Sequence, residues 1–205
     1  MIPRYSRKEV SDIWSDENKY KTWLEIEVAV CEAWAHFGEI PKESVEVIKE
    51  KADFDIDRIN ELEKELKHDV LAFLTSVSEF VGDDSRFIHL GMTSSDVLDT
   101  ALAVQLRDAG KIIIADLEKL LEVLKEKSYE NMDVPMIGRS HGIHAEPKTL
   151  GLVFALWYDE MKRNLSRMKR AVNAVSVGMM SGAVGTYANI DPKVEDYACK
   201  LLGLE

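Results

Sequence analysis

Residues 138–147 contain several side chains that can transfer protons and bind anions. The stretch reads Gly-Arg-Ser-His-Gly-Ile-His-Ala-Glu-Pro and contains two histidines, His141 and His144. Histidine titrates near neutral pH, which suits it to general acid or base catalysis. The two histidines could also form a metal pair, but no further cluster of histidine or cysteine supports one. A solvated loop with incidental histidines is the remaining interpretation.

Pro147 closes this stretch, and a long amphipathic run follows it. Proline suits the first turn of a helix, because the N–H that it lacks would have no partner there. We therefore expect residues 138–147 to form a loop that leads into a helix. Titratable side chains on a loop that a rigid scaffold holds are typical of a catalytic site.

A second group of polar side chains precedes another run with helical period. Thr93, Ser94, Ser95 and Asp96 stand at its start. The simplest interpretation is that Ser94 or Ser95 caps a helix. The free N–H groups and the positive end of the helix dipole can also bind a carboxylate or a phosphate, and the hydroxyls of Thr93 and Ser94 would add donors. Both interpretations can hold together.

His68 lies in a run, residues 57–81, that has one apolar stripe. At about 100° per residue, His68 falls opposite Ile59 on a single helix, so we expect it to face water or a second surface rather than the core. Lys67 and Asp69 flank it. A solvated cluster of charges is the alternative interpretation.

Residues 178–189 form a second expected loop, with three glycines that permit a close approach of backbone to a ligand. The loop lacks the Gly-Lys-Ser/Thr ending of a Walker phosphate loop. Alone it does not indicate a particular ligand.

Nearly every patterned segment has helical period and no strand pattern is evident, so we predict an all-α fold. Trp23 and Trp34 are expected in the core, and Ser6 with Glu9 forms a possible capping box. The expected helices are residues 6–14, 18–37, 42–52, 57–81, a run that starts near 94, a run from 111, a run after 147 and a run from 191.

Two domains are expected, a small N-terminal helical domain over residues 1–110 and the start of an extended helical bundle over 111–205. Gly110 is expected to mark a bend or the boundary. The long helices from Lys111 and after Pro147 each carry one strong apolar stripe. A chain of this length cannot cover both stripes, so we expect other chains to complete the bundle.

The composition excludes several classes of protein. A formal net charge of −11 argues against wholesale binding to nucleic acid or to an anionic membrane, although basic side chains gathered locally could bind an anion. Cys31 and Cys199 lie far apart without a CxxC motif, which indicates thiols of a reducing compartment. The N-terminal residues lack the apolar segment of a signal peptide, and no apolar run approaches the ~20 residues of a membrane span.

Three stretches together resemble the adenylosuccinate lyase family, within the fumarase/aspartase superfamily: residues 91–96, 139–147 and 181–189. Residues 3–6 and 67–69 also resemble it. The resemblance implies β-elimination of fumarate from adenylosuccinate to give AMP, and the same cleavage of the succinylamino imidazole carboxamide ribotide, in purine nucleotide biosynthesis. It implies a cytoplasmic homotetramer whose sites combine residues of several subunits, and no metal or organic cofactor.

By this resemblance, His141 is the general acid/base at the substrate nitrogen, and His68 lies close to the chemistry. The resemblance also assigns substrate contacts. It implies that Thr93 and Ser94 bind the succinyl carboxylate, and that Arg4 and Tyr5 bind the nucleotide phosphate. It places Lys67, His68 and Asp69 on the nucleotide side, and His89 and Ser140 are weaker candidates.

The family's catalytic serine belongs to a part of the family pattern that lies beyond Glu205. We therefore expect the sequence to represent the N-terminal part of a lyase, and the 205 residues alone to show little or no activity. Two other functions stay open. One is another fumarate-releasing lyase, such as one that acts on argininosuccinate. The other is a non-catalytic helical module that only oligomerises.

Overall fold

The computed structural model describes residues 2–205, which divide into two compact units. Unit 1 combines the chain up to Asp108 with Val175–Glu205, and unit 2 is Ala109–Ala174. Helices dominate both units, and the described residues contain a single two-stranded sheet, so the all-α prediction is confirmed. The division into an N-terminal domain and the first part of a bundle at residue 110 stays a prediction.

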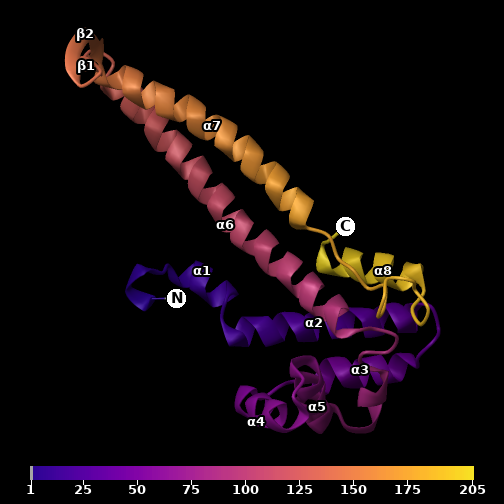
Figure 1. Ribbon diagram of the computed structural model, residues 1–205. Helices are drawn as coiled ribbons and strands as arrows, with labels where there is room; N and C mark the ends of the chain where they lie inside the picture. The colour runs from indigo at the N-terminus through magenta and orange to yellow at the C-terminus, as the bar shows by residue number, and fades with distance from the viewer. Residues whose placement is uncertain (1) are drawn as a thin grey trace. The chain divides into compact units, whose positions relative to one another are not determined.

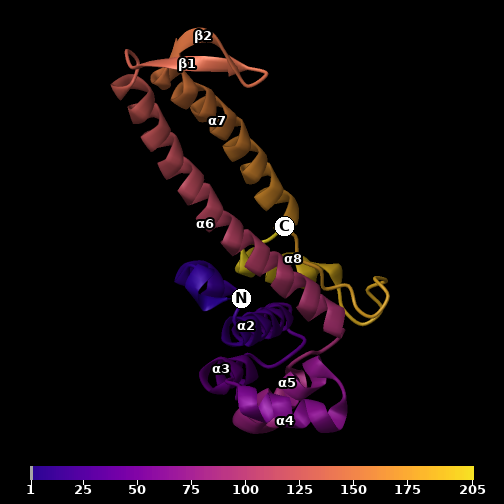
Figure 2. The same ribbon diagram turned by 60° about the vertical axis from the view of Figure 1, so that its left-hand side comes forward.

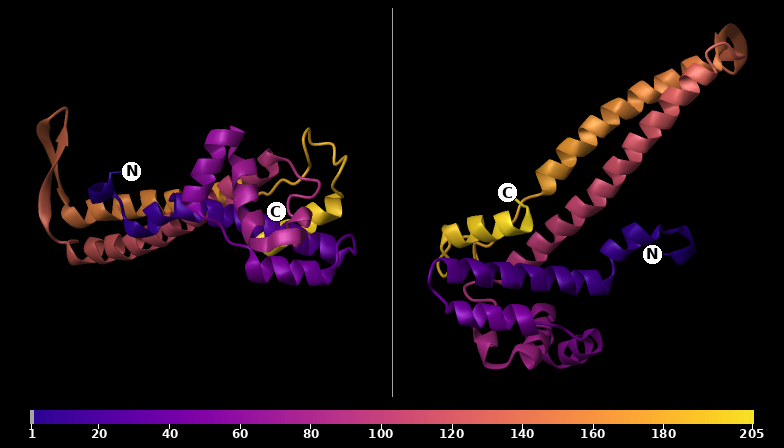
Figure 3. Two further views of the ribbon diagram at one scale, coloured as in Figure 1. Left: turned by 90° about the horizontal axis from the view of Figure 1, so that it is seen from below. Right: turned by 180° about the vertical axis from the view of Figure 1, so that it is seen from behind.

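Unit 1 is built around the helix α2 (Asp16–His36), which packs against α3 on one side and α8 on the other (Figures 1 and 3). The other elements are 3-10 helix η1 (Pro3–Tyr5), α1 (Lys8–Ile13), α3 (Lys42–Lys51), α4 (Ile56–Leu66), α5 (Asp69–Val81), 3-10 helix η2 (Gly82–Phe87), α8 (Pro192–Leu202) and the first turns of α6 (Ser94–Glu130).

Aromatic rings and aliphatic side chains fill the core of unit 1. Trp23 packs edge-on against Tyr20 and Phe73, with ring centroids 5.2 and 5.4 Å apart. Trp23 and Trp34 are buried, as predicted. Cys31 and Cys199 are also buried, and burial raises the pKa of both thiols, that of Cys199 to about 11. Both therefore remain neutral thiols near pH 7.

The prediction of one helix over residues 57–81 is wrong, because the chain breaks at Lys67 and His68. Lys67 takes a left-handed conformation, with φ 55°, and ends α4. His68 then caps α5, since its Nδ1 accepts a hydrogen bond of 3.3 Å from the N–H of Leu71. The apolar period continues across the break because α4 and α5 bury their stripes in the same core.

The start of α1 also differs from the prediction. The helix begins at Lys8, no side chain caps it, and the hydroxyl of Ser6 donates to the carbonyl of Ile2 instead of to a helix start. The capping box of Ser6 and Glu9 is therefore wrong. The next helix, α2, is capped by Ser15, whose oxygen accepts from the N–H of Asn18.

Unit 2 is a pair of antiparallel helices joined by a β-hairpin (Figure 2). It contains the rest of α6, the strands β1 (Pro135–Ser140) and β2 (Ile143–Thr149), and most of α7 (Leu150–Val175). The ammonium of Lys169 pairs with Glu118 across the helices at 2.8 Å. The helix α6 continues through Gly110, where a β-carbon would meet the side chain of Val172, so the glycine permits close helix packing rather than a bend.

The hairpin corrects the prediction of a loop leading into a helix at Pro147. Pro147 lies in β2 opposite Ile137, and α7 begins only at Leu150. His141 and Gly142 form the two-residue connection, and both have positive φ, 51° and 82°, as a type I′ turn requires. A two-stranded sheet has only edge strands, so it tolerates the missing N–H of proline.

Among the described residues, no helix has the length and apolar character that crossing a membrane requires.

The close packing around Gly151, where the hairpin joins α7, leads to a first prediction. A β-carbon on Gly151 would lie 2.7 Å from Cα of Met132 and against the carbonyl of Ser128. These are backbone atoms, so Gly151→Ala should destabilise the protein by roughly 1–3 kcal/mol despite the better helix propensity of alanine.

Chemical denaturation of the full-length protein measures this change. Glu160 is an exposed polar residue of the same helix, and Glu160→Ala should shift stability by no more than about 0.5 kcal/mol. A Gly151→Ala protein as stable as its parent would contradict the packing described for unit 2.

Candidate active site

Backbone strain is confined to the segments that the sequence analysis singled out. Among the described residues, the non-glycine residues with positive φ are Lys67, His89, His141 and Tyr187. Such conformations are uncommon for residues with a side chain and persist where the surrounding structure holds them, most often at functional sites. The residues with unusual backbone conformations thus lie in or beside the segments whose side chains suggested a functional site.

Asp96 joins two of these segments through one buried carboxylate. Its side chain is 0% exposed and accepts hydrogen bonds from the backbone N–H groups of Thr93, Ser181 and Gly182, at 2.8, 3.1 and 3.2 Å. The first bond closes the start of α6. The other two fasten the glycine-rich loop, residues 178–189, to that helix start.

Ser94 and Ser95 already lie inside α6, so neither is its N-cap and that prediction is wrong. The N–H of Thr93 donates to Asp96. This bond is one half of a capping box, in which the third helical residue accepts from the N–H of the residue before the helix. The hydroxyl of Ser94 is therefore not needed to cap the start of α6.

The helix α8 holds the glycine-rich loop from its other side. Glu195 accepts from the hydroxyl of Tyr187 at 2.8 Å and from the N–H of Met180 at 2.6 Å. The hydrogen bond to Glu195 raises the pKa of Tyr187, so the phenol stays protonated and keeps donating. The N–H of Tyr187 also donates to the carbonyl of Ser181. The loop is thus fixed at both ends although it has no regular secondary structure.

His68 reaches the start of α6. Its Nε2 lies 3.4 Å from the hydroxyl oxygen of Ser94, which brings the segment 67–69 to the segment 93–96. Its Nδ1 accepts the N–H of Leu71, so a neutral His68 carries its proton on Nε2, toward Ser94. The side chain is 47% exposed, which confirms that His68 lies outside the core.

His89 is held by a buried acid that the sequence analysis missed. Glu27 in α2 is 1% exposed and accepts from both Nδ1 and the backbone N–H of His89. The sequence could have indicated a buried acid, because Glu27 falls on the apolar face of α2 between Trp23 and Val30. Asp96 was missed as a structural acid, although its spacing from Thr93 matches a capping box.

The remaining predicted residues lie elsewhere. Ser140 and His141 are exposed at the hairpin of unit 2, with His141 at the first position of the turn. In unit 1 the guanidinium of Arg4 stacks over the ring of Tyr5 at 4.8 Å.

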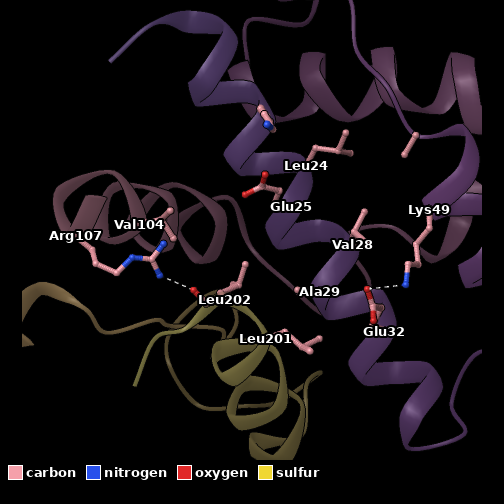
Figure 4. Close-up of a pocket in the computed structure, with 12 residues that line it drawn as sticks. Leu24, Glu25, Val28, Ala29, Glu32, Lys49, Val104, Arg107, Leu201 and Leu202 are labelled. Atoms are coloured by element: carbon pink, nitrogen blue, oxygen red, sulfur yellow. Dashed lines mark hydrogen bonds and ion pairs between the residues drawn. The ribbon is translucent and has the colours of Figure 1, made fainter. Parts of the chain in front are cut away.

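A cavity of about 570 Å³ lies between α2, α8 and the first part of α6 (Figure 4). Its polar contacts are an ion pair of Lys49 with Glu32, at 3.3 Å, and a bond from Arg107 to the carbonyl of Leu202, at 2.5 Å. None of the predicted site residues lines it. Across the described part of the chain, no three histidine, cysteine or acidic side chains are placed to hold a metal ion.

A protein-family model described as Lyase matches residues 4–205. The chain belongs to this lyase family. It is 55% identical to adenylosuccinate lyase of Bacillus subtilis (strain 168) and 51% identical to adenylosuccinate lyase of Staphylococcus saprophyticus, in each case over 100% of this chain and 48% of the relative. A third relative, adenylosuccinate lyase of Streptococcus mutans, is 52% identical over 100% of this chain and 47% of its own length.

The chain therefore spans about half the length of the curated relatives it matches. Solved structures agree with the fold. A fumarate lyase from Mesorhizobium sp. BNC1 superposes with a TM-score of 0.91 at 27% identity, over 98% of this chain and 50% of that one. A beta-carboxy-cis,cis-muconate cycloisomerase from Acinetobacter calcoaceticus sp. ADP1 gives 0.90 at 30% identity, over 97% and 49%. These matches confirm the lyase resemblance on which the sequence analysis rests.

The start of α6 and the glycine-rich loop should depend on Asp96 for their shape. In Asp96→Asn an amide N–H₂ would face at least one of the three backbone N–H groups, and buried donors would lose their acceptor. We expect the full-length protein to lose roughly 2–4 kcal/mol of stability, because hydrogen bonds to a buried charged group are worth more than neutral ones.

Thermal and chemical denaturation measure the loss, and Asp99→Asn is the matched control, since Asp99 is exposed on the same turns of α6. If the two variants are equally stable, Asp96 does not fasten the loop.

Proposed function

We propose that this protein is an adenylosuccinate lyase, which eliminates fumarate from adenylosuccinate to leave AMP and cleaves the succinylamino imidazole carboxamide ribotide in the same way. The contact of His68 with Ser94 at the start of α6 carries this proposal on the structural side. This contact supports a proton donor beside a helix start that suits a carboxylate. The names of the three relatives, at 51–55% identity, supply the substrate.

The start of α6 suits the succinyl carboxylate. The helix is 37 residues long, and the positive end of its dipole and its free N–H groups lie at the Thr93–Ser94 end. The hydroxyls of Thr93 and Ser94 add donors there. Lys67 and Asp69 flank His68 on the proposed nucleotide side, with His89 nearby in sequence, and Arg4 and Tyr5 are proposed for the phosphate.

The elimination needs a base for the proton on the succinyl carbon and an acid for the departing nitrogen. We assign His141 as the acid/base at the nitrogen, with Ser140 beside it on the hairpin turn. His68, whose Nε2–H points toward Ser94, lies close to the reacting bond and can donate a proton. The base is the serine that the family resemblance places outside residues 1–205.

The apolar surface of unit 2 supports a homotetramer whose subunits share each site. Both strands of the hairpin are largely exposed, and an isolated two-stranded hairpin is at best marginally stable in water. Large apolar side chains also stand exposed on its helices, namely Ile113, Leu120, Val123, Leu152, Leu156 and Trp157. A neighbouring subunit would cover them, and a cytoplasmic location fits the two neutral, unpaired thiols.

A substrate panel tests the proposed reaction. The full-length protein should release fumarate from adenylosuccinate and not from argininosuccinate. Release from argininosuccinate alone would assign the chain to another fumarate-releasing lyase. No release from either, by a protein that folds and oligomerises, would favour the helical assembly module.

Replacing the proposed acid tests its role separately. His141→Ala in the full-length protein should lower turnover of adenylosuccinate by roughly 10²–10⁴-fold, the usual contribution of general acid–base catalysis. The side chain is exposed, so the protein should still fold. Near-normal turnover would remove His141 from the mechanism.

A further inference from the structure

Glu27 is an acidic residue buried in the core face of α2. Its side chain is 1% exposed, between apolar neighbours such as Ile26 and Val30, which are also buried. Burying a carboxylate is costly unless hydrogen bonds satisfy it. A role in packing alone would be served better by an apolar residue, so the contacts of Glu27 need another explanation.

Both oxygens of Glu27 bind the same residue. Oε1 lies 2.6 Å from Nδ1 of His89, and Oε2 accepts the backbone N–H of His89 at 2.8 Å. This two-point contact fixes the backbone and the ring together, and it holds His89 in a left-handed conformation with φ 67°. Residues with a side chain keep such a conformation only where the surrounding structure enforces it.

The contact also determines which ring nitrogen of His89 is free to act. Nδ1 must carry a proton to bond the carboxylate, so the lone pair or second proton is on Nε2. Nε2 has no hydrogen-bond partner among residues 2–205, and no buried side-chain nitrogen or oxygen there lacks one, so Nε2 is open to solvent. The imidazole side chain is 21% exposed.

The charged groups that act on His89 are Glu27 of α2 and Asp96 of α6. Burial lowers the pKa of His89, but the hydrogen bond and charge of Glu27, with the charge of Asp96, raise it, and the net result is a pKa above its usual value. The pairing therefore stabilises the fold fully below about pH 6.5 and less as the pH rises through the folded pKa.

We propose that Glu27 is a positioning residue that fixes the ring of His89 and favours its protonated form, with Nε2–H directed outward to bind an oxyanion of the ligand. The assignment of that oxyanion to adenylosuccinate rests on the proposed function, whereas the pairing itself does not. His89 lies four residues before Thr93, on the same segment that leads into α6, so a cation here adds to the positive helix start.

Nuclear magnetic resonance titration of the full-length protein, with histidines labelled at Cε1, tests the pairing directly. The resonance missing from His89→Gln identifies His89. We expect its midpoint above about 6.5 in the parent, and about one pH unit lower or more in Glu27→Gln, which is about a 10-fold change in its protonation equilibrium. Glu25→Gln is the matched control, because Glu25 is exposed on the same helix, and it should leave the midpoint unchanged.

A parent midpoint at or below about 6.5 would overturn the proposal even if Glu27→Gln did not fold. An unchanged midpoint in a folded Glu27→Gln would overturn it as well. In the cleavage assay, Glu27→Gln should raise KM more than it lowers kcat, because His89 binds rather than reacts. If adenylosuccinate is not cleaved while the titration behaves as expected, the proposed function fails and the pairing of Glu27 with His89 stands.

Discussion

The hydrogen bonds that Asp96 accepts from three backbone amides organise unit 1. A fully buried carboxylate is tolerated because three N–H groups satisfy it. Glu27 and Glu195 act in the same way, from α2 and α8, on His89 and on Met180. Three acids on three helices thus each bind a backbone N–H of an irregular segment. In unit 1, these acids hold the irregular segments, whereas His141 in unit 2 is held by the backbone pairing of the hairpin.

This arrangement is consistent with the anion site that we propose on an acidic chain. The formal net charge is −11, but Asp96 and Glu27 each accept hydrogen bonds from backbone N–H groups beside the proposed site. What faces outward is the start of α6, Nε2 of His68 and Nε2 of His89. Groups fixed before a ligand arrives need no rearrangement in the transition state, which is the main source of electrostatic catalysis.

Sequence periodicity predicted the helices and the buried tryptophans because those depend on one repeating apolar face. It could not show the break at Lys67, since α4 and α5 bury their stripes in one core and the period continues across it. It missed the hairpin because strands exposed on both faces have no alternation to detect. Two of the three partners of Asp96 lie 85 and 86 positions away in sequence, and that of Glu27 lies 62 away, so only the fold reveals them.

A crystal structure of the full-length protein with AMP and fumarate bound tests the central claim most directly. The claim is that buried acids hold the α6 start and His89, and that these lie with His68 around one ligand site. We expect a ligand oxyanion at the hydroxyl of Ser94, with His68 in contact with the ligand and Asp96 still bound to its three amides. Ligands bound away from both His68 and Ser94, or an Asp96 carboxylate turned to solvent in the complex, would contradict it.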